Sequence, residues 1–301
     1  MKRFIISKLL GLGLISGAFA AGSYVENFEG VGSLSYVGNK STSLGNGAEV
    51  YANNGTAVNL FSFGGWKALR LIQDTTGDTV STYVVGAVES PGTRVNSFTA
   101  SFDVQFKAAD APADRFSFNF GNLAGTLPRD GEAGLWVSGQ TGSMLSLVWD
   151  FWDNTTSGNP DFVGSNANKG VELYRNGSLV SGSQINNPVA VQTSLGASFT
   201  RVNVRYDEEL NGGTLILNTG GTVAGGNLIS GGTDHLTLSN LGVSFSTGDR
   251  FAFSGATGGA EMDVFLDNIS IQTVPEPSAG ALLVLGLGSL IALRRTRRSA
   301  V

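Results

Sequence analysis

A short segment rich in aspartate and asparagine holds the side chains best suited to binding a metal ion. Its aspartate and asparagine side chains, which follow an apolar run, are Asp150, Asp153, Asn154, Asn159 and Asp161. Calcium takes about six to eight oxygen ligands, which the carboxylates, amides and backbone carbonyls of one loop can supply. The same residue types also form turns in which side chains hydrogen-bond their own backbone. The segment therefore predicts either a calcium-binding loop or an Asx-rich turn.

Two of the four tryptophans, Trp149 and Trp152, lie in or directly before the same segment. The four tryptophans are Trp66, Trp136, Trp149 and Trp152. An exposed indole offers a flat, largely apolar face on which a sugar ring can stack. Trp149 and Trp152 are three residues apart, so on a strand they point to opposite faces, and at least one of them is expected in the core. Trp152, nearer the loop, is the candidate sugar platform.

The cysteine and histidine content excludes several kinds of active site. The chain has no cysteine, which excludes thiol catalysis, disulfides and cysteine-based zinc sites, and it has one histidine. A Ser-His-Asp triad would need that residue, His235, but the sequence contains no nucleophile elbow. We therefore expect His235 to be a strand-edge residue without a catalytic role.

The charge balance of the body excludes nucleic acid as a partner. The two chain ends hold seven of the 19 basic and one of the 24 acidic residues, so the body carries 12 basic and 23 acidic residues, a net charge of −11. Such a body repels phosphate backbones. Acidic groups on a secreted protein indicate solubility or calcium binding instead.

Residues 1–20 have the pattern of a secretory signal peptide. Lys2, Arg3 and Lys8 precede an apolar stretch at 9–20, in which Ala18-Phe19-Ala20 forms a small-x-small cleavage site. The stretch is too short to span a membrane, which argues against a retained anchor. We expect cleavage after Ala20 and export of a body that covers residues 21–273.

The last 28 residues, 274–301, combine a proline-containing segment that breaks secondary structure, an apolar run and a cluster of arginines. In order these are Val274, Pro275, Glu276 and Pro277, the run at 279–293, and Arg294, Arg295, Arg297 and Arg298. The run has 15 residues, whereas a stable transmembrane helix takes about 20, and its glycines weaken a helix further. The arginines are expected to stay on the cytoplasmic side. The tail thus predicts a short hydrophobic helix that holds the protein transiently in a membrane, with an ordinary single-pass anchor as the alternative.

The body shows the period of two that is typical of β-strands. Residues 98–107 alternate Phe, Ala, Phe, Val and Phe with polar residues, and 116–120 alternate Phe with polar residues. Further short runs lie at 202–206, 215–217, 251–253 and 264–271. No helical stripe of useful length occurs. Strands with one apolar and one solvent-facing side predict an all-β fold, in which two antiparallel sheets stack as a β-sandwich.

The tail resembles the PEP-CTERM sorting signal of Gram-negative bacteria, down to the Val-Pro-Glu-Pro-Ser spelling of 274–278. The resemblance implies that an exosortase, a protease in the inner membrane, recognises the tail and cleaves near Pro-Glu-Pro. It also implies release of the body to the cell surface or the extracellular polysaccharide matrix.

The body resembles the concanavalin A-like jelly roll of the L-type and legume lectins over about 97–273. The segments that carry the resemblance are 113–118, 147–161, 201–207, 250–258 and 265–271. The resemblance implies that Asp114 contacts the sugar and that Asp150, Asn154 and Asp161 are ligands of calcium. The sequence departs from the family pattern at Val148, where a metal-binding glutamate is expected, and at Arg115, where a glycine is expected.

These observations favour a non-enzymatic protein that binds extracellular polysaccharide. A structural matrix or surface protein without a specific ligand is one alternative, and a glycoside hydrolase of the same fold is another. A hydrolase needs two carboxylates that face one cleft. Asp150 and Asp153 differ by three positions and so point to opposite faces of a strand, and the glutamates of the hydrolase pattern are missing.

Overall fold

The computed structural model describes most of the body between Gly22 and Pro275. The described residues are 22–37, 40–41, 44, 47–52, 58–73, 79–89, 94–108, 115–123, 144–151, 170–186, 188–189, 191–224, 228–245, 248–257 and 262–275. The predicted signal peptide and the tail from Glu276 onward lie outside them. Among the described residues, no helix is long and apolar enough to cross a membrane.

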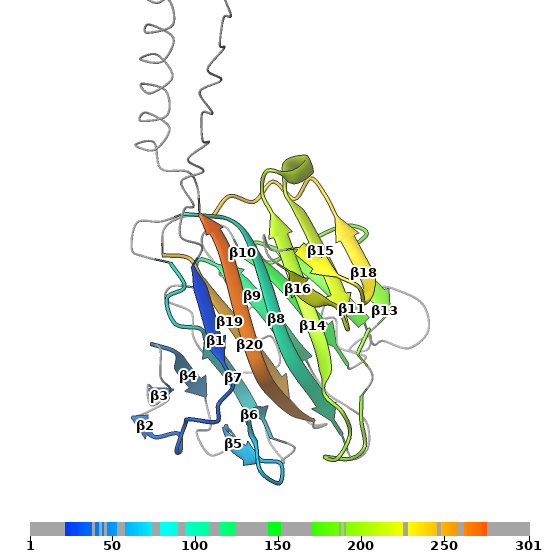
Figure 1. The fold of residues 1–301 in the computed structure, drawn as a ribbon. Coiled ribbons are helices and arrows are strands. Elements are labelled where there is room, and N and C mark those ends of the chain that lie inside the picture. Colours follow the sequence, from blue (N-terminus) through cyan, green and yellow to red (C-terminus); the bar gives the residue numbers. More distant parts are fainter. Residues whose placement is uncertain are drawn as a thin grey trace, which may run out of the picture. The chain divides into compact units, whose positions relative to one another are not determined.

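Two large antiparallel sheets make up the body, which confirms the predicted β-sandwich (Figure 1). Sheet 1 has the strand order β18 (Thr233–Leu238), β15 (Thr214–Thr219), β14 (Thr200–Asp207), β8 (Val95–Lys107), β20 (Asp263–Pro275), β6 (Lys67–Ile72) and β5 (Asn59–Ser62), with β1 (Ser23–Glu26) also paired to β20. Sheet 2 has the order β12 (Ser178–Leu179), β11 (Gly170–Arg175), β10 (Met144–Asp150), β9 (Arg115–Gly121), β19 (Arg250–Thr257), β7 (Thr79–Val84), β4 (Glu49–Ala52), β3 (Lys40–Ser41) and β2 (Tyr36–Val37), with β13 (Ile185–Asn186) paired to β11. A small hairpin of β16 (Thr222–Ala224) and β17 (Leu228–Ser230) and one 3₁₀ turn, η1 (Leu210–Gly212), complete the described elements.

Phenylalanine side chains from both sheets fill the space between the sheets. Between ring centroids, Phe102 of β8 lies 4.9 Å from Phe253 of β19, and Phe98 of β8 lies 4.5 Å from Phe120 of β9. Every second residue of β8 and β9 points inward, as the alternation predicts, and these rings are buried. Each buried aromatic side chain contributes roughly 2–3 kcal/mol of hydrophobic stabilisation. This aromatic layer fixes the two sheets face to face.

The polar side of the central strands of sheet 2 is also buried, so the expectation of a solvent-facing side was wrong there. Ser117 and Asn119 of β9 have no exposed surface. These side chains bond within the sheet, because Asn119 Nδ2 donates to Ser117 Oγ at 2.9 Å, and the hydroxyls of Thr82 and Ser254 lie 3.0 Å apart. Sequence alternation reports which side chains share a face, but not whether that face meets water.

The last strand, β20, extends two residues beyond the predicted end of the body at Thr273. Val274 pairs with Ser97 and Pro275 pairs with Val95 of β8. The sheet therefore reaches the first proline of the Pro-Glu-Pro motif, and no linker separates the sandwich from that motif.

Candidate functional site

Of the residues predicted to bind sugar or metal, only Asp150 lies among the described residues. Asp114, Trp152, Asn154 and Asp161 lie outside them, and so do Glu276, Pro277, Arg294 and Arg295 of the predicted sorting signal. Trp149, the other tryptophan of the segment, is fully buried in the core. The roles assigned to the residues outside the described part stay predictions.

Asp150 forms a buried ion pair with Arg115. Asp150 ends β10 and stands directly opposite Arg115, the first residue of β9. Arg115 Nε lies 2.9 Å from Asp150 Oδ2, and the two side chains are 5% and 1% exposed. Their strand neighbours Phe116 and Trp149 point into the core, so the pair lies on the face of sheet 2 that points away from sheet 1.

A second polar cluster lies beside this pair, on β11. Tyr174 Oη donates to Glu172 Oε2 at 2.7 Å, and Gln184 Nε2 donates to Glu172 Oε1 at 2.8 Å. Burial, followed by the charge of Glu172, raises the pKa of Tyr174, so its phenol stays a proton donor. Both oxygens of Glu172 therefore accept hydrogen bonds from neutral donors.

Asp150 as it lies does not fit the calcium role that the lectin resemblance implies. A calcium ligand must present its oxygens to the ion. The carboxylate of Asp150 is buried and already faces the cationic guanidinium of Arg115, the residue that stands where the family has glycine. In the described part of the chain, no three acidic or histidine side chains are grouped in a way that could hold a metal ion.

We expect calcium to leave the thermal midpoint of the body unchanged, because Arg115 already neutralises the first predicted ligand. An ion that binds only the folded state must raise the midpoint. Thermal melts with calcium, with magnesium and with EGTA measure this. A saturable rise with calcium that EGTA reverses would show instead that the loop with Asn154 and Asp161 forms a site.

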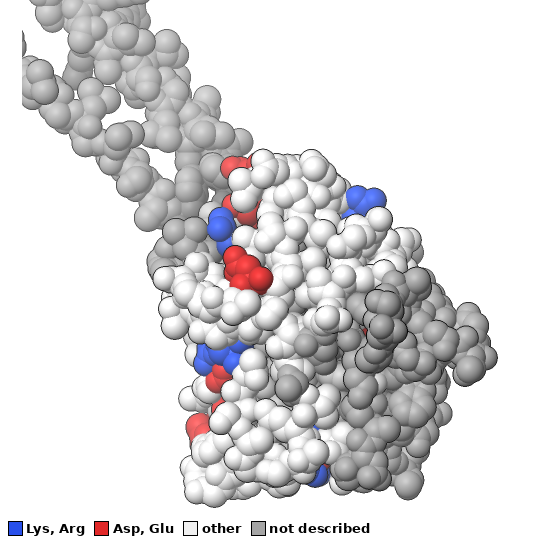
Figure 2. Space-filling view, turned by 90° about the vertical axis from the view of Figure 1, so that its right-hand side faces the viewer, with Lys and Arg blue, Asp and Glu red and all other residues white. Residues whose placement is uncertain are grey.

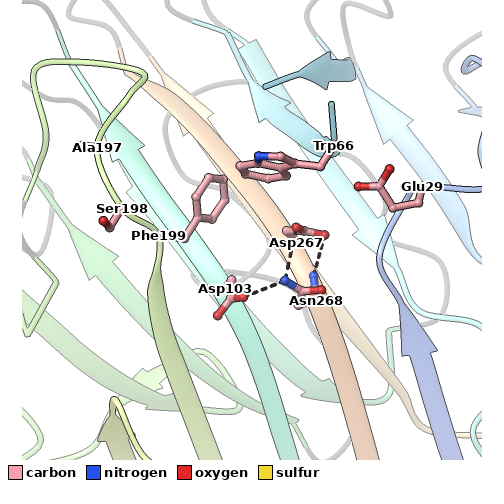
Figure 3. A pocket seen from close by; sticks show the side chains of 8 residues that line it. All are labelled: Glu29, Trp66, Asp103, Ala197, Ser198, Phe199, Asp267 and Asn268. Atoms are coloured by element: carbon pink, nitrogen blue, oxygen red, sulfur yellow. Dashed lines mark hydrogen bonds between the residues drawn. The ribbon is translucent and has the colours of Figure 1, made fainter. Parts of the chain in front are cut away.

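A groove of about 520 Å³ lies on the outer face of sheet 1 (Figure 3). The residues that line it are Glu29, Trp66, Asp103, Ala197, Ser198, Phe199, Asp267 and Asn268. They come from the segment after β1, the β5–β6 turn, β8, the segment before β14, and β20. Residues far apart in the sequence thus meet at one place.

A bulge in β20 places two polar side chains at the bottom of this groove. Asp267 pairs with Asp103, and the next pair in the ladder is Ser270 with Ser101, so two residues of β20 stand against one of β8. Asn268 has a φ of 47°, in the left-handed region that asparagine tolerates better than most residues. The bulge turns Asn268 to the outer face beside Asp267, where alternation alone would turn it inward.

Hydrogen bonds hold the two opposed carboxylates of the groove together. Like charges directly opposite each other on a sheet repel. Asn268 Nδ2 donates to Asp103 Oδ2 at 2.8 Å and to Asp267 Oδ2 at 3.3 Å, and the backbone N–H of Asn268 donates to Asp267 Oδ1 at 2.7 Å. Arg201 donates a further bond to Asp103 Oδ2 at 2.8 Å. Asn268 therefore bridges both carboxylates.

Asp267 should make the stability of the fold depend on pH. Burial, with smaller contributions from Asp103 and Glu29, raises the pKa of Asp267 from 3.8 to about 6. The folded state therefore holds this proton more tightly than the unfolded state, and stability contributed by Asp267 is fully present below pH 3.8 and is lost as the pH rises towards 6. We expect Asp267→Asn to remove this loss, so that the variant gains about 1–2 kcal/mol relative to wild type between acidic and neutral pH.

Urea unfolding of the wild type and of Asp267→Asn at acidic and at neutral pH measures this difference. The control is Glu209→Gln, an exposed acid away from the groove, which should leave the pH profile unchanged. If the free energies of unfolding of Asp267→Asn and wild type differed by the same amount at both pH values, the pKa of Asp267 would not be raised in the folded state.

In the sequence, Trp66 is one of four tryptophans, and Asp267 and Asn268 lie in a segment that resembles the lectins. Nothing in the sequence predicts that these three residues lie close together in space. The Gly64-Gly65 pair before Trp66 signals a tight turn that presents the indole. No local signal gives the register of β20 on β8, which decides that Asp267 faces Asp103.

Comparison with solved structures finds a similar fold in several lectins. No known protein family and no curated protein matches the sequence. Lectin II from Ulex europaeus is similar in structure, with a TM-score of 0.55 and 16% identity over 83% of this chain and 97% of that one. A lectin from Bauhinia forficata, solved in complex with GalNAc, has a TM-score of 0.52 and 16% identity over 86% of this chain and 100% of that one.

The exoplasmic/lumenal domain of VIP36 is similar as well. Its Ca²⁺-bound form has a TM-score of 0.53 and 14% identity over 86% of this chain and 92% of that domain. The body thus has the lectin-like β-sandwich fold over nearly the whole length of these structures. At these identities the likeness establishes the fold.

Proposed function

We propose that the body is an exported lectin-like protein that binds extracellular polysaccharide and catalyses no reaction. The observation that carries the proposal is the sandwich itself, which matches lectin II over 97% of the length of that lectin. One of the similar structures was solved with GalNAc and another with Ca²⁺ and Man2. A hydrolase would need two free, facing carboxylates, and Asp150 is already paired with Arg115.

We place the sugar-binding site where the chain enters β9 and leaves β10. Arg115, the first residue of β9, pairs with Asp150, the last residue of β10. The segment with Asp114, before β9, and the segment with Trp152, after β10, therefore join the sheet at the same end of these two strands. A carboxylate accepts hydrogen bonds from sugar hydroxyls, and an indole stacks on the ring. The Arg115–Asp150 pair would fix the strand ends that carry both residues, without a metal ion.

Charge supports a polysaccharide partner over a nucleic acid. Among the described residues on the face seen in Figure 2, the basic side chains lie apart from one another and form no patch. The body as a whole is acidic. Neither feature attracts a phosphate backbone.

In this proposal, the two ends of the chain direct its export and its sorting to the cell surface. Residues 1–20 would direct export, and 274–301 would hold the protein in the inner membrane until an exosortase-type protease cuts near Pro275-Glu276-Pro277. Because β20 ends at Pro275, cleavage after Pro275 would leave every strand of the sandwich intact. Fractionation of cells that express the full chain tests the route, since the shortened body should leave the membrane fraction for the cell surface or medium.

A glycan array probed with the purified body tests the binding function. We expect wild type to bind at least one polysaccharide, Asp114→Ala to bind it more weakly, and the exposed-residue control Glu209→Ala to bind it as wild type does. Binding to no glycan by a body that unfolds cooperatively would favour the structural role. Release of reducing sugar would favour the hydrolase.

A further inference from the structure

An exposed aromatic side chain stands at the groove on sheet 1, on a rigid support. Trp66 is 36% exposed, although Phe63 stacks on one face of its indole with ring centroids 4.6 Å apart and planes 12° apart. Phe199 packs nearly at right angles to the indole at 5.2 Å. The Gly64-Gly65 turn, with a positive φ at both residues, holds Trp66 at the end of the β5–β6 hairpin. More than a third of the Trp66 surface thus stays exposed, although two aromatic rings hold the indole in place.

Polar groups face this ring from the bottom of the groove (Figure 3). Asn268 is exposed and projects from the bulge, with Asp103 and Asp267 on either side of it. The carboxylate oxygens of both aspartates can accept hydrogen bonds, and the amide of Asn268 can accept through its oxygen. Ser198 adds an exposed hydroxyl from the segment before β14. The groove thus combines an apolar platform with several hydrogen-bonding groups.

The groove is acidic. Glu29, Asp103 and Asp267 line it, and none of the described residues that line it is Lys or Arg. Arg201 offsets only the charge of Asp103, with which it is paired. A ligand that carries carboxylates or sulfates would meet repulsion here, whereas the hydroxyls of an uncharged sugar can donate to these acceptors.

We propose that this groove is a second saccharide-binding site, which binds a ring of an uncharged polysaccharide against Trp66, with its hydroxyls bonded to Asp103, Asp267 and Asn268. The ligand class rests on the proposed function, but the site does not, since it lies on sheet 1 and uses neither Asp114 nor Trp152. The volume of about 520 Å³ accommodates a pyranose ring and part of its neighbour. Two sites on one body would let it bridge polysaccharide strands.

Binding titrations of the purified body against a neutral β-glucan, mannan and galactan, with alginate as the acidic polymer, test this site. We expect binding to a neutral polymer and none to alginate. Trp66→Ala should lower the apparent association constant by about tenfold, and Trp66→Phe, which keeps a flat ring, by about twofold. Asn268→Gly, which keeps the positive φ and removes the amide, should also weaken binding. Leu179→Ala, an exposed apolar residue on sheet 2, is the matched control and should change nothing.

The outcomes separate this site from the proposed function. Binding by wild type that Asp114→Ala abolishes, but that Trp66→Ala and Asn268→Gly leave unchanged, would overturn the second site and keep the lectin. Preferential binding to alginate would contradict the assignment of an uncharged polysaccharide to this groove. Binding to no polysaccharide would overturn both proposals. Thermal melts of each variant identify any loss of binding that comes from unfolding.

Discussion

Replacing Asp150 with asparagine should lower the free energy of unfolding by about 3–5 kcal/mol, because it removes the carboxylate charge that the buried guanidinium of Arg115 faces across the two strands. The two side chains are 1% and 5% exposed, so water cannot solvate the guanidinium in place of the carboxylate. Asparagine has nearly the same shape as aspartate, so the loss reports charge rather than packing. Urea unfolding followed by tryptophan fluorescence measures it.

The double variant Arg115→Met/Asp150→Leu is the matched control for this prediction. A buried ion pair replaced by apolar residues of similar volume is often neutral in stability, because the cost of burying both charges disappears with their attraction. We therefore expect the double variant to unfold close to wild type. A loss below about 1 kcal/mol in Asp150→Asn, the value of an exposed pair, would mean that water reaches Arg115.

Replacing Phe102 with alanine should cost about 3–5 kcal/mol, the range for a large aromatic deleted from a packed core. Phe102 is the residue through which β8 of sheet 1 contacts four rings of sheet 2. These rings are Phe116 at 6.2 Å, Phe118 at 5.9 Å, Trp149 at 6.5 Å and Phe253 at 4.9 Å between centroids. Removing it opens a cavity between the sheets that the strands on either side cannot close.

Equilibrium unfolding of Phe102→Ala, with Val25→Ala as the control, measures this cost. Val25 is 65% exposed, so its truncation should change stability by less than about 0.5 kcal/mol. Phe102→Leu should fall between the two. Equal stabilities of Phe102→Ala and Val25→Ala would refute the view that this aromatic layer joins the sheets.

The fold was predictable because its signal is local. The alternation of Phe98, Phe102 and Phe106 with polar residues needs no knowledge of the partner strand, and it marks the inward side correctly. The burial of Ser117 and Asn119 was not predictable, because the same alternation is compatible with a face that meets water or a covered one.

The sites were less predictable because they depend on pairing between distant strands. Arg115 and Asp150 were both singled out in the sequence, yet only the register of β9 on β10 shows that one neutralises the other. The groove needs the bulge between Asp267 and Ser270, which brings Asn268 to the outer face. A one-residue change in either register would move these side chains to the other face.

Affinity electrophoresis of the purified body through gels that contain neutral polysaccharides shows whether the sandwich binds such polymers. We expect wild type to be retarded in at least one such gel. Asp114→Ala combined with Trp66→Ala should restore free mobility while the variant still unfolds cooperatively. Equal mobility of the folded wild type in every gel and in gels without polysaccharide would contradict this expectation.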